Sequence, residues 1–279
     1  MSWDGKTISE WGQEVDGADV VINLAGRSVN CRYTAENRKQ IMDSRVDSTK
    51  VVGDSISAAK KPPSLWLQMS TATIYSHRFD AANDETTGII GGTEPDAPPQ
   101  WRFSISVAQA WERTLDEAPT PSTRKVKLRT SIVMSPDRGG PFDTLLTLVR
   151  LGLGGQNGSG RQYISWITDL DFFRAIEFII ANQNINGVVN LATPNPIPNE
   201  EFMSILRNQW GTRVGLPSAM WMLSIGALVL QTETELILKS RRVVPGVLLA
   251  ENFKFELPQW ACAAHQLCER WRQLRSARS

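Results

Sequence analysis

Three regularly spaced glycines are the first residues whose pattern could do chemistry. Gly152, Gly155 and Gly158 lie in "GLGGQNGSG" and form a G-x-x-G-x-x-G pattern. Such glycines bind the pyrophosphate of a dinucleotide when they join a strand to the N-terminus of a helix. Here a helical pattern precedes the glycines and the strand-like "RQYISWI" follows them. Because this order is wrong for a phosphate-binding loop, we interpret the stretch as a glycine-rich connection.

Histidines and cysteines could bind a metal, but their spacing does not favour it. The two histidines, His77 and His265, have no partners at ligand spacing, and neither completes a Ser-His-Asp pattern. The three cysteines, Cys31, Cys262 and Cys268, are odd in number and are not spaced as metal ligands. We therefore predict no metal site, no disulfide framework and a reducing, cytoplasmic location.

Charge and hydropathy exclude several classes of partner. The 279 residues carry 30 basic and 29 acidic side chains, a net charge of +1. This balance gives no electrostatic reason to expect nucleic acid or an anionic membrane as a partner. The most apolar run, 216–230, is shorter than the roughly 20 residues that span a bilayer. We expect that run to form a helix packed in a C-terminal subdomain.

The elements that position any site alternate between strand-like and helix-like patterns. This alternation predicts an α/β fold with a doubly wound parallel sheet. From about residue 193 the pattern is mostly helical, so we expect one larger unit over 1–192 and a smaller one over 193–279. The predicted strands cover 19–23, 64–70, 125–135, 162–167 and 187–192, and the predicted helices cover 34–59, 101–117, 142–151 and 168–182.

Six stretches, in this order, resemble one branch of the extended short-chain dehydrogenase/reductase superfamily. This branch is the NAD(P)-dependent, sugar-epimerase-like one that ends in a small C-terminal domain of unknown function. The resemblance runs from Trp3 to about residue 265 and implies a Rossmann-like domain followed by a helical, substrate-side subdomain. The stretches are "VINLAGRSV", "RKQIMDSRVDST", "STATIYS", "LRTSIVMSPDRGG", "RLGLGGQNGSGRQYISWITDLD" and "RRVVPGVLLAENFKFELPQW".

The resemblance also implies a chain that starts late within the fold. The strand at 19–23 matches the fourth strand of the family, and "WDG" at 3–5 resembles the end of the third. We therefore expect an N-terminally truncated Rossmann-like sheet that lacks its first strands and glycine loop, with doubtful dinucleotide affinity. The apolar strand at 19–23 reads as one buried on both faces. As an unpaired edge, it would favour a homodimer, other self-association or a rearranged N-terminus.

NADP or NAD is the cofactor that the resemblance implies. Small residues after the strand at 19–23 would let the backbone approach the adenosine and pyrophosphate closely, although a simple strand end needs them equally. Arg32 resembles a phosphate contact, with a solvated loop arginine as the alternative. The cofactor-binding set implied by the resemblance is Asn23, Leu24, Ala25, Gly26, Arg32, Ser70, Arg129, Ser131, Ile132 and Val133.

Catalytic groups are harder to place. In the superfamily a Ser or Thr at the position of Ser70 or Thr71 hydrogen-bonds the substrate oxygen, and a Tyr-x-x-x-Lys pair moves the proton. Phe103 and Val107 stand where that pair is expected, and neither ionises. We therefore predict Thr71 and Tyr75 as catalytic residues; the alternative for Tyr75 is a packing or loop-anchoring role.

Arg161 follows "GSG" and resembles a position that faces the substrate pocket, where a guanidinium suits an anionic or polyhydroxyl ligand. Three interpretations remain open. The chain could be an NAD(P)-dependent oxidoreductase or epimerase acting on a small, sugar-like substrate. It could be an inactive binding or regulatory protein that keeps the fold. It could also be a truncated product without a function of its own.

Overall fold

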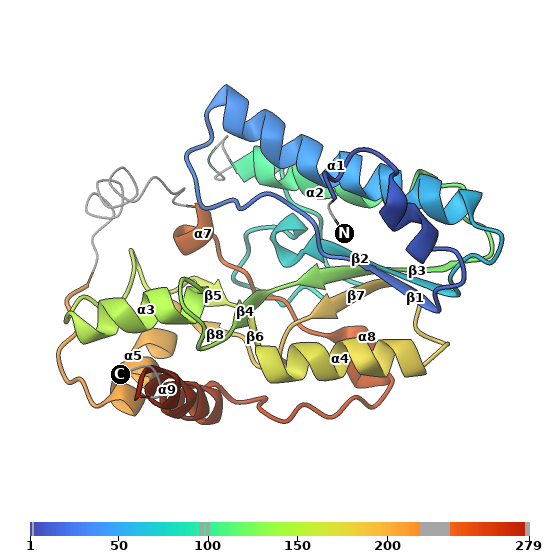
Figure 1. Cartoon of the computed structure of the whole chain (residues 1–279). Helices are drawn as coiled ribbons and strands as arrows, with labels where there is room; N and C mark the ends of the chain where they lie inside the picture. The colour runs from blue at the N-terminus through green and yellow to red at the C-terminus, as the bar shows by residue number, and fades with distance from the viewer. Residues whose placement is uncertain (2, 95–97, 99–100, 218–234, 277–279) are drawn as a thin grey trace.

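A four-stranded parallel sheet forms the centre of the protein (Figure 1). The strands stand in the order β1-β2-β3-β7, and each pairs in parallel with its neighbours. Their bounds are β1 (Val20–Asn23), β2 (Leu65–Thr71), β3 (Arg124–Thr130) and β7 (Gly187–Leu191). The computed structural model describes residues 1, 3–94, 98, 101–217 and 235–276.

Helices cover both faces of this sheet, which confirms the predicted doubly wound α/β fold. On one face lie α1 (Ala35–Ala58) and α2 (Trp101–Glu117), and on the other lie α4 (Asp169–Ala181) and α8 (Gly246–Ala250) (Figure 1). The Thr34 hydroxyl caps α1, as predicted, by accepting a hydrogen bond from the backbone N–H of Asn37 at 3.2 Å.

A second group of elements packs beside the carboxyl end of the sheet. Its apolar core joins Phe142 and Val149 to Phe202 and Trp260, so helices from both sides of residue 193 share it. The elements are β4 (Ile132–Met134), α3 (Pro141–Arg150), β5 (Tyr163–Ile164), β6 (Trp166–Thr168), β8 (Ile197–Pro198), α5 (Asn199–Trp210), α7 (Glu235–Leu238) and α9 (Trp260–Ser276).

Two predicted strands are each divided in the structure. The predicted strand 125–135 breaks at Ser131, whose backbone N–H and hydroxyl both donate to the carbonyl oxygen of Leu191, at 3.0 and 2.8 Å. Strand pairing with β7 therefore ends there, and β4 leaves the central sheet to pair with β6. The predicted strand 162–167 likewise divides into β5, which pairs with β8, and β6.

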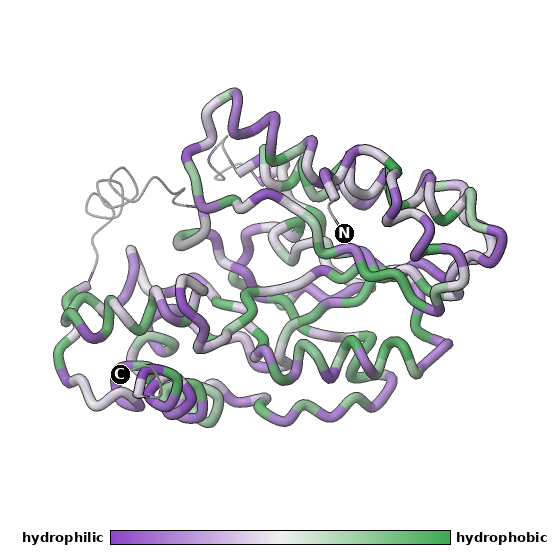
Figure 2. The backbone as a smooth tube through the Cα atoms, viewed as in Figure 1, coloured by the Kyte–Doolittle hydropathy of each residue, from purple (hydrophilic) through white to green (hydrophobic). Residues whose placement is uncertain are grey.

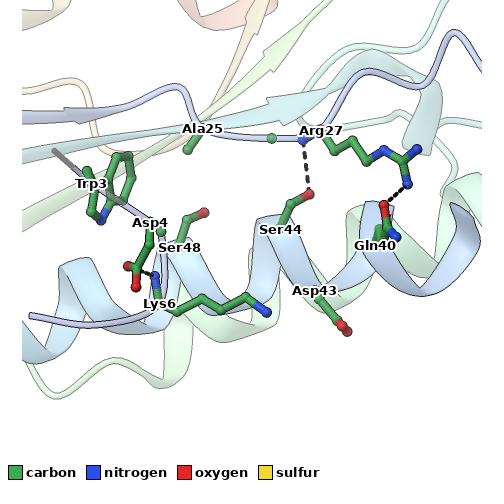
Figure 3. A pocket seen from close by; sticks show the side chains of 11 residues that line it. Trp3, Asp4, Lys6, Ala25, Arg27, Gln40, Asp43, Ser44 and Ser48 are labelled. Atoms are coloured by element: carbon green, nitrogen blue, oxygen red, sulfur yellow. Dashed lines mark hydrogen bonds between the residues drawn. The ribbon is translucent and has the colours of Figure 1, made fainter. Parts of the chain in front are cut away.

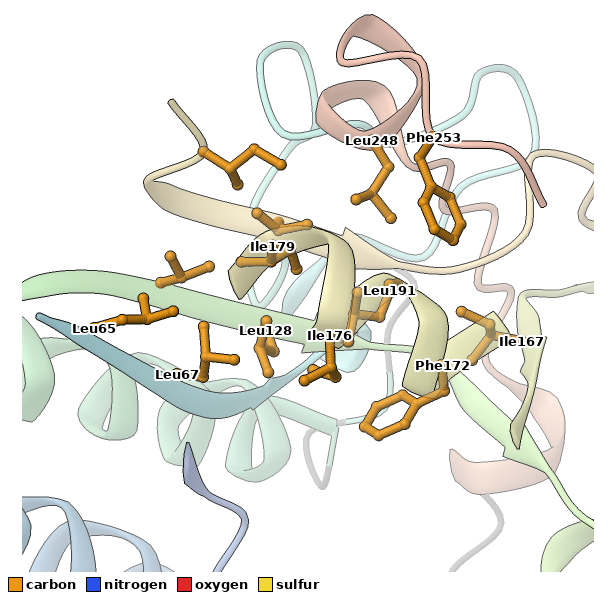
Figure 4. Close-up of a cluster of buried hydrophobic side chains, with 14 residues drawn as sticks. Leu65, Leu67, Leu128, Ile167, Phe172, Ile176, Ile179, Leu191, Leu248 and Phe253 are labelled. Carbon is orange, nitrogen blue, oxygen red and sulfur yellow. The ribbon is translucent and has the colours of Figure 1, made fainter. Parts of the chain in front are cut away.

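The main core lies between the sheet and α4 (Figure 4). Hydrophobic residues of α4 and of the sheet are also visible as green stretches in Figure 2. Leu67, Leu128 and Val189 of three adjacent strands are fully buried there, against Ile176 and Ile179 of α4. Each such side chain contributes roughly 1.5–3 kcal/mol through burial. This core holds together the strands whose carboxyl ends form the edge that carries the candidate site.

Strand β1 lies at one edge of the sheet and, within the described residues, pairs only with β2. The prediction that this strand is buried on both faces is wrong for Ile22, whose side chain is 42% exposed in this edge strand. Residues 3–19 form the short helix η1 (Glu10–Glu14) and no strand. From this segment, Trp11 and Val15 pack against Trp66 on the face that α1 and α2 cover.

Two further expectations concern membranes and the apolar run. None of the helices within the described residues is long and apolar enough to cross a membrane. The helix predicted over 216–230 falls almost wholly on residues 218–234, which lie outside the described part of the chain. Self-association through β1 stays a prediction.

Candidate functional site

The carboxyl ends of four parallel strands meet at one edge of the sheet. In open α/β sheets, ligands bind at this edge. The register pairs Asn23 with Gln68, Ser70 with Arg129, and Thr71 with Thr130. Residues predicted as site residues from separate parts of the sequence therefore come together here.

A cavity of about 390 Å³ opens beside the loop after β1 (Figure 3). Ala25 and Gly26, two of the predicted cofactor-binding residues, line it. The indole of Trp3 and the hydroxyl groups of Ser44 and Ser48 form other parts of its wall. The full lining comprises residues 3–6 and 25–27 together with Gln40, Asp43, Ser44 and Ser48 of α1.

The loop that lines this cavity is held on both sides. The Asn23 side chain is buried; its Oδ1 accepts from the backbone N–H of Ala25 at 3.0 Å and its Nδ2 donates to Gln68 Oε1 at 3.1 Å. The backbone N–H of Arg27 donates to Ser44 Oγ at 3.0 Å, and Arg45 Nη1 donates to the carbonyl oxygen of Arg27 at 3.1 Å. Asn23 thus shapes the loop and uses both its polar atoms to do so.

The charges around the cavity determine what it fits. Backbone N–H groups of Thr7 and Lys6 donate to the Asp4 carboxylate and lower its pKa to about 2, so Asp4 is ionised at neutral pH. Asp43 lines the same cavity from α1. Carboxylates accept hydrogen bonds from hydroxyl groups and repel phosphates. Lys6 and Arg27 also line the cavity, so its charges are mixed and suit a polar ligand that carries hydroxyl groups.

Ser70 and Arg129 are part of a buried polar network with Glu112 of α2. Ser70 Oγ donates to Glu112 Oε1 at 2.6 Å, and the Arg129 guanidinium donates to both carboxylate oxygens at 2.8 Å. Burial acts to lower the pKa of Arg129, but the Glu112 carboxylate outweighs it and the pKa is raised. The polar groups of Ser70 and Arg129 are thus directed toward α2.

Tyr75 is buried in the interior. Its side chain is 2% exposed, its hydroxyl donates to Asn190 Oδ1 at 3.0 Å, and the Arg129 guanidinium lies 4.9 Å from its ring centroid. Burial raises the pKa of the phenol. This buried, hydrogen-bonded position is the one expected for the packing role that the sequence left open, and the acid–base role of Tyr75 stays a prediction.

The other predicted residues occupy varied positions. Thr71 ends β2, half-buried, and its Oγ1 accepts from the backbone N–H of Thr73 at 3.2 Å, which leaves the hydroxyl hydrogen to donate elsewhere. Leu24 is 53% exposed. Arg32 and Arg161 are exposed on loops. Ile132 and Val133 lie in β4 and pack against the two large apolar clusters.

A cluster of charges that the sequence did not predict is brought by the C-terminal part of the chain to the turn after β2. Glu235 Oε2 accepts from Ser104 Oγ at 2.6 Å, and Lys239 Nζ lies 3.6 Å from Glu235 Oε1. Lys239 Nζ donates to the carbonyl oxygen of Thr73 at 2.8 Å, and Arg241 Nε donates to Thr73 Oγ1 at 3.3 Å. All three charged side chains are buried.

Burial perturbs the two ends of this ion pair in opposite directions. It lowers the pKa of Lys239 to about 8, an effect that Glu235 opposes, and it raises the pKa of Glu235. Perturbed titratable groups at a ligand-binding edge are candidates for function. The signal in the sequence is "KSRRVVPG": Arg241 opens the stretch that carries the resemblance, and Lys239 stands two residues before it.

Within the described residues, no three His, Cys, Asp or Glu side chains lie close enough together to hold a metal ion. The described cysteines Cys31, Cys262 and Cys268 are free thiols.

Comparison with known proteins finds relatives that are named as epimerase family proteins. The chain is 26% identical to Epimerase family protein SDR39U1 of Homo sapiens over 272 residues, 96% of this chain and 86% of that protein. It is 30% identical to Epimerase family protein Mb2239 of Mycobacterium bovis over 240 residues, 85% of this chain and 74% of that protein. A family model described as a domain of unknown function (DUF1731) matches residues 220–267.

A solved structure matches nearly the whole fold. The crystal structure of human epimerase family protein SDR39U1 (isoform 2) with NADPH covers 92% of this chain and 86% of its own, with a TM-score of 0.80 and 25% identity. The parallel sheet, its helices and this match define a Rossmann-like protein of the short-chain dehydrogenase/reductase class. Within that class, the chain belongs to the epimerase family.

Proposed function

We propose that this chain binds NADPH or NADH at the carboxyl edge of its central sheet and acts as an NAD(P)-dependent oxidoreductase or epimerase on a small polar substrate. The observation that carries this proposal is the match to the human structure with NADPH, at a TM-score of 0.80 over 92% of the chain. The cavity beside Ala25 and Gly26 supports it, because these residues are the ones expected beneath the dinucleotide.

The residues of the cavity fit part of the cofactor. The hydroxyl groups of Ser44 and Ser48 and the carboxylate of Asp4 would hydrogen-bond a ribose, and the Trp3 indole would contact a base. No strand–glycine–helix turn adjoins β1 in the described residues, so we expect a weak dinucleotide affinity. When bound, the dinucleotide would supply hydride transfer.

Other residues of this edge are assigned to the substrate or to support. We propose that Thr71 hydrogen-bonds a substrate oxygen and that Arg161 faces an anionic or polyhydroxyl group. Ser70 and Arg129 instead hold β2, β3 and α2 together through Glu112. Arg32, Ser131, Ile132 and Val133 stay predictions as cofactor contacts, as do Asn23 and Leu24.

The predicted division at residues 192–193 is also part of the proposal. We assign residues 1–192 to dinucleotide binding and residues 193–279 to the substrate side. The contacts of Lys239 and Arg241 with Thr73 support this assignment, because they bring the C-terminal unit to the end of β2.

A second candidate is a binding or regulatory protein without hydride chemistry. Phe103 and Val107 on α2 carry no ionisable proton, and Tyr75 is held in the interior by Asn190. A protein of this kind would bind a dinucleotide but would not oxidise or reduce any ligand.

Titration of NADPH and NADH by quenching of tryptophan fluorescence tests the proposal, since the chain has 10 tryptophans. Saturable quenching is expected. Ala25→Leu would fill the cavity and weaken binding about tenfold or more, a cost of about 1.4 kcal/mol. Leu151→Ala is the control, because Leu151 is exposed, does not line the cavity and is not among the predicted cofactor contacts. Absence of saturable quenching by either dinucleotide would overturn the proposal.

A further inference from the structure

A second cavity, of about 220 Å³, lies beside α2. Residues of α2, of β3 and of the segments that follow β2 line it, and it shares no lining residue with the cavity beside Ala25 and Gly26. Pockets for drug-sized ligands measure about 300–1,000 Å³, so this second cavity has room only for a smaller molecule.

One wall of this second cavity is apolar. Ile74, in the short helix η2 (Ala72–Ile74), is buried, and the half-buried Ile90 packs against the same hydrophobic cluster. The backbone holds the two isoleucines together, because the N–H of Gly91 donates to the carbonyl oxygen of Ile74 at 2.9 Å and Tyr75 forms an antiparallel bridge with Ile90. This wall is therefore preformed, and it gains from contact with an aliphatic group.

The polar wall comes from one face of α2. Gln109, Glu112, Arg113 and Asp116 line the cavity, and their spacing of three and four residues places them on the same side of the helix. Glu112 is buried, whereas the other three side chains are exposed. A ligand that enters the cavity from solvent can therefore reach an amide and a guanidinium group.

The carboxylates of this wall are already paired with cations. The Arg129 guanidinium donates to both oxygens of Glu112 at 2.8 Å, and Lys127 Nζ donates to both oxygens of Asp116 at 2.8 and 2.9 Å. Arg113, in contrast, makes no ion pair or hydrogen bond with any other described residue. The cavity thus offers one cation without a counter-charge, which favours an anionic ligand.

We propose that this second cavity binds a short aliphatic carboxylate. Its carboxylate group pairs with the Arg113 guanidinium, whose planar fork of donors matches two carboxylate oxygens. The Gln109 amide, on the same face of α2, donates a further hydrogen bond to the ligand. The alkyl group of the ligand packs against Ile74 and Ile90. A phosphate ion has the charge but no alkyl group to cover the isoleucines, so the cavity distinguishes the two anions.

The second cavity adjoins groups that position the end of β2. Glu112 Oε1 also accepts from Ser70 Oγ at 2.6 Å, and Ile74 stands three residues after Thr71. A carboxylate bound here would therefore contact the same helix and turn that support the carboxyl edge of the sheet. Its binding needs no dinucleotide, so its test is independent of the proposed function.

The test is a titration of the full chain with isobutyrate, followed by NMR of ¹³C-labelled isoleucine δ1 methyl groups. Ile74→Val and Ile90→Val assign the two resonances, which should shift saturably. Arg113→Gln should weaken isobutyrate binding about threefold or more, because it removes the charge that pairs with the carboxylate. Arg102→Gln is the matched control, because Arg102 is an exposed arginine of the same helix that does not line the cavity, and this variant should bind as the wild type does.

Two other probes separate charge from apolar contact. Isobutanol carries the same alkyl group without the charge, inorganic phosphate carries charge without the alkyl group, and each should bind about threefold or more weakly than isobutyrate. Arg113→Lys keeps the cation and should retain part of the affinity. Because Arg113 is exposed, Arg113→Gln should leave the fold intact, which thermal unfolding verifies. Equal affinities of the wild type and Arg113→Gln, equal affinities for isobutyrate and either other probe, or the absence of saturable shifts at both methyl groups would each overturn the inference.

Discussion

Lys239 Nζ lies 2.8 Å from the carbonyl oxygen of Thr73, a residue 166 positions earlier in the sequence. This contact joins the C-terminal unit to the turn that follows β2. It also places a buried ammonium group, with Glu235 3.6 Å away, beside the edge where the strands end. The turn that follows β2 is therefore held by a residue outside the central sheet.

The stability of the protein should rise with pH because of Lys239. Burial lowers the pKa of Lys239 from 10.5 to about 8. Between these values the unfolded chain binds more protons than the folded one, so the free energy of unfolding rises with pH and the cost of the buried charge is fully present below about pH 8. The free energy of unfolding rises by at most about 3 kcal/mol between pH 8 and pH 10.5. Chemical denaturation at several pH values, compared with Lys239→Met, measures it. The same pH dependence in both proteins would contradict this assignment.

Removal of one partner of the buried Lys239–Glu235 ion pair should lower the free energy of unfolding. Glu235→Gln leaves the Lys239 ammonium without its counter-charge and should destabilise the protein by about 3–5 kcal/mol. The double variant Glu235→Gln with Lys239→Met should recover part of that loss. Asp80→Asn is the control, because the Arg78–Asp80 pair is on the surface and should add no measurable stability. A double variant as unstable as Glu235→Gln alone would show that the pair does not act as a unit.

The buried network around Glu112 predicts a strong coupling between Ser70 and Glu112. Glu112→Gln should destabilise the fold by about 3–5 kcal/mol, because Arg129 keeps its charge in a buried position. Ser70→Ala should cost about 1–3 kcal/mol. As a control, Asp116→Asn breaks the Lys127–Asp116 surface pair and should cost about 1 kcal/mol or less. Additive effects of the Ser70 and Glu112 substitutions in the double variant would contradict the network.

Tyr75→Phe separates packing from chemistry. The substitution leaves Asn190 Oδ1 without the hydroxyl donor and should destabilise the protein by about 1–3 kcal/mol. NADPH affinity should not change, because the hydroxyl is inside the protein. Thr71→Val is the comparison: it should keep the fold while weakening any turnover once a substrate is known. Unchanged stability together with lost turnover in Tyr75→Phe would support the acid–base role.

Self-association through β1 can be tested on a surface residue of that strand. An unpaired strand edge is a template for another chain. Ile22→Lys places a charge at an exposed position and should reduce any dimer or aggregate seen by light scattering. An identical, monodisperse monomer in wild type and Ile22→Lys would show that the edge does not mediate association.

The helices were well predicted because their signals are local. The cap at Thr34 and the end at Pro62–Pro63 delimit α1, and Pro98–Pro99 precede α2. The break at Ser131 had no local signal, because it depends on hydrogen bonds to Leu191, which is 60 residues away.

The candidate site was predicted only in part. The ends of β1 and β2 reach the edge that their strand patterns implied, so Thr71 and Gly26 lie where expected. The direction of the Tyr75 side chain depends on the turn η2 and on Asn190, which the sequence pattern does not reveal. Lys239 and Arg241 were missed because their contacts are made across the fold.

Hydrogen–deuterium exchange of the wild-type chain with and without saturating NADPH tests the central claim most directly, since it reports both binding and its place. The account predicts slower exchange at residues 23–27 and 71–75, the loops that follow β1 and β2, with the outer helix α9 unchanged. Unaltered exchange at both loops, or protection confined to other parts of the chain, would contradict dinucleotide binding at the carboxyl edge of the sheet.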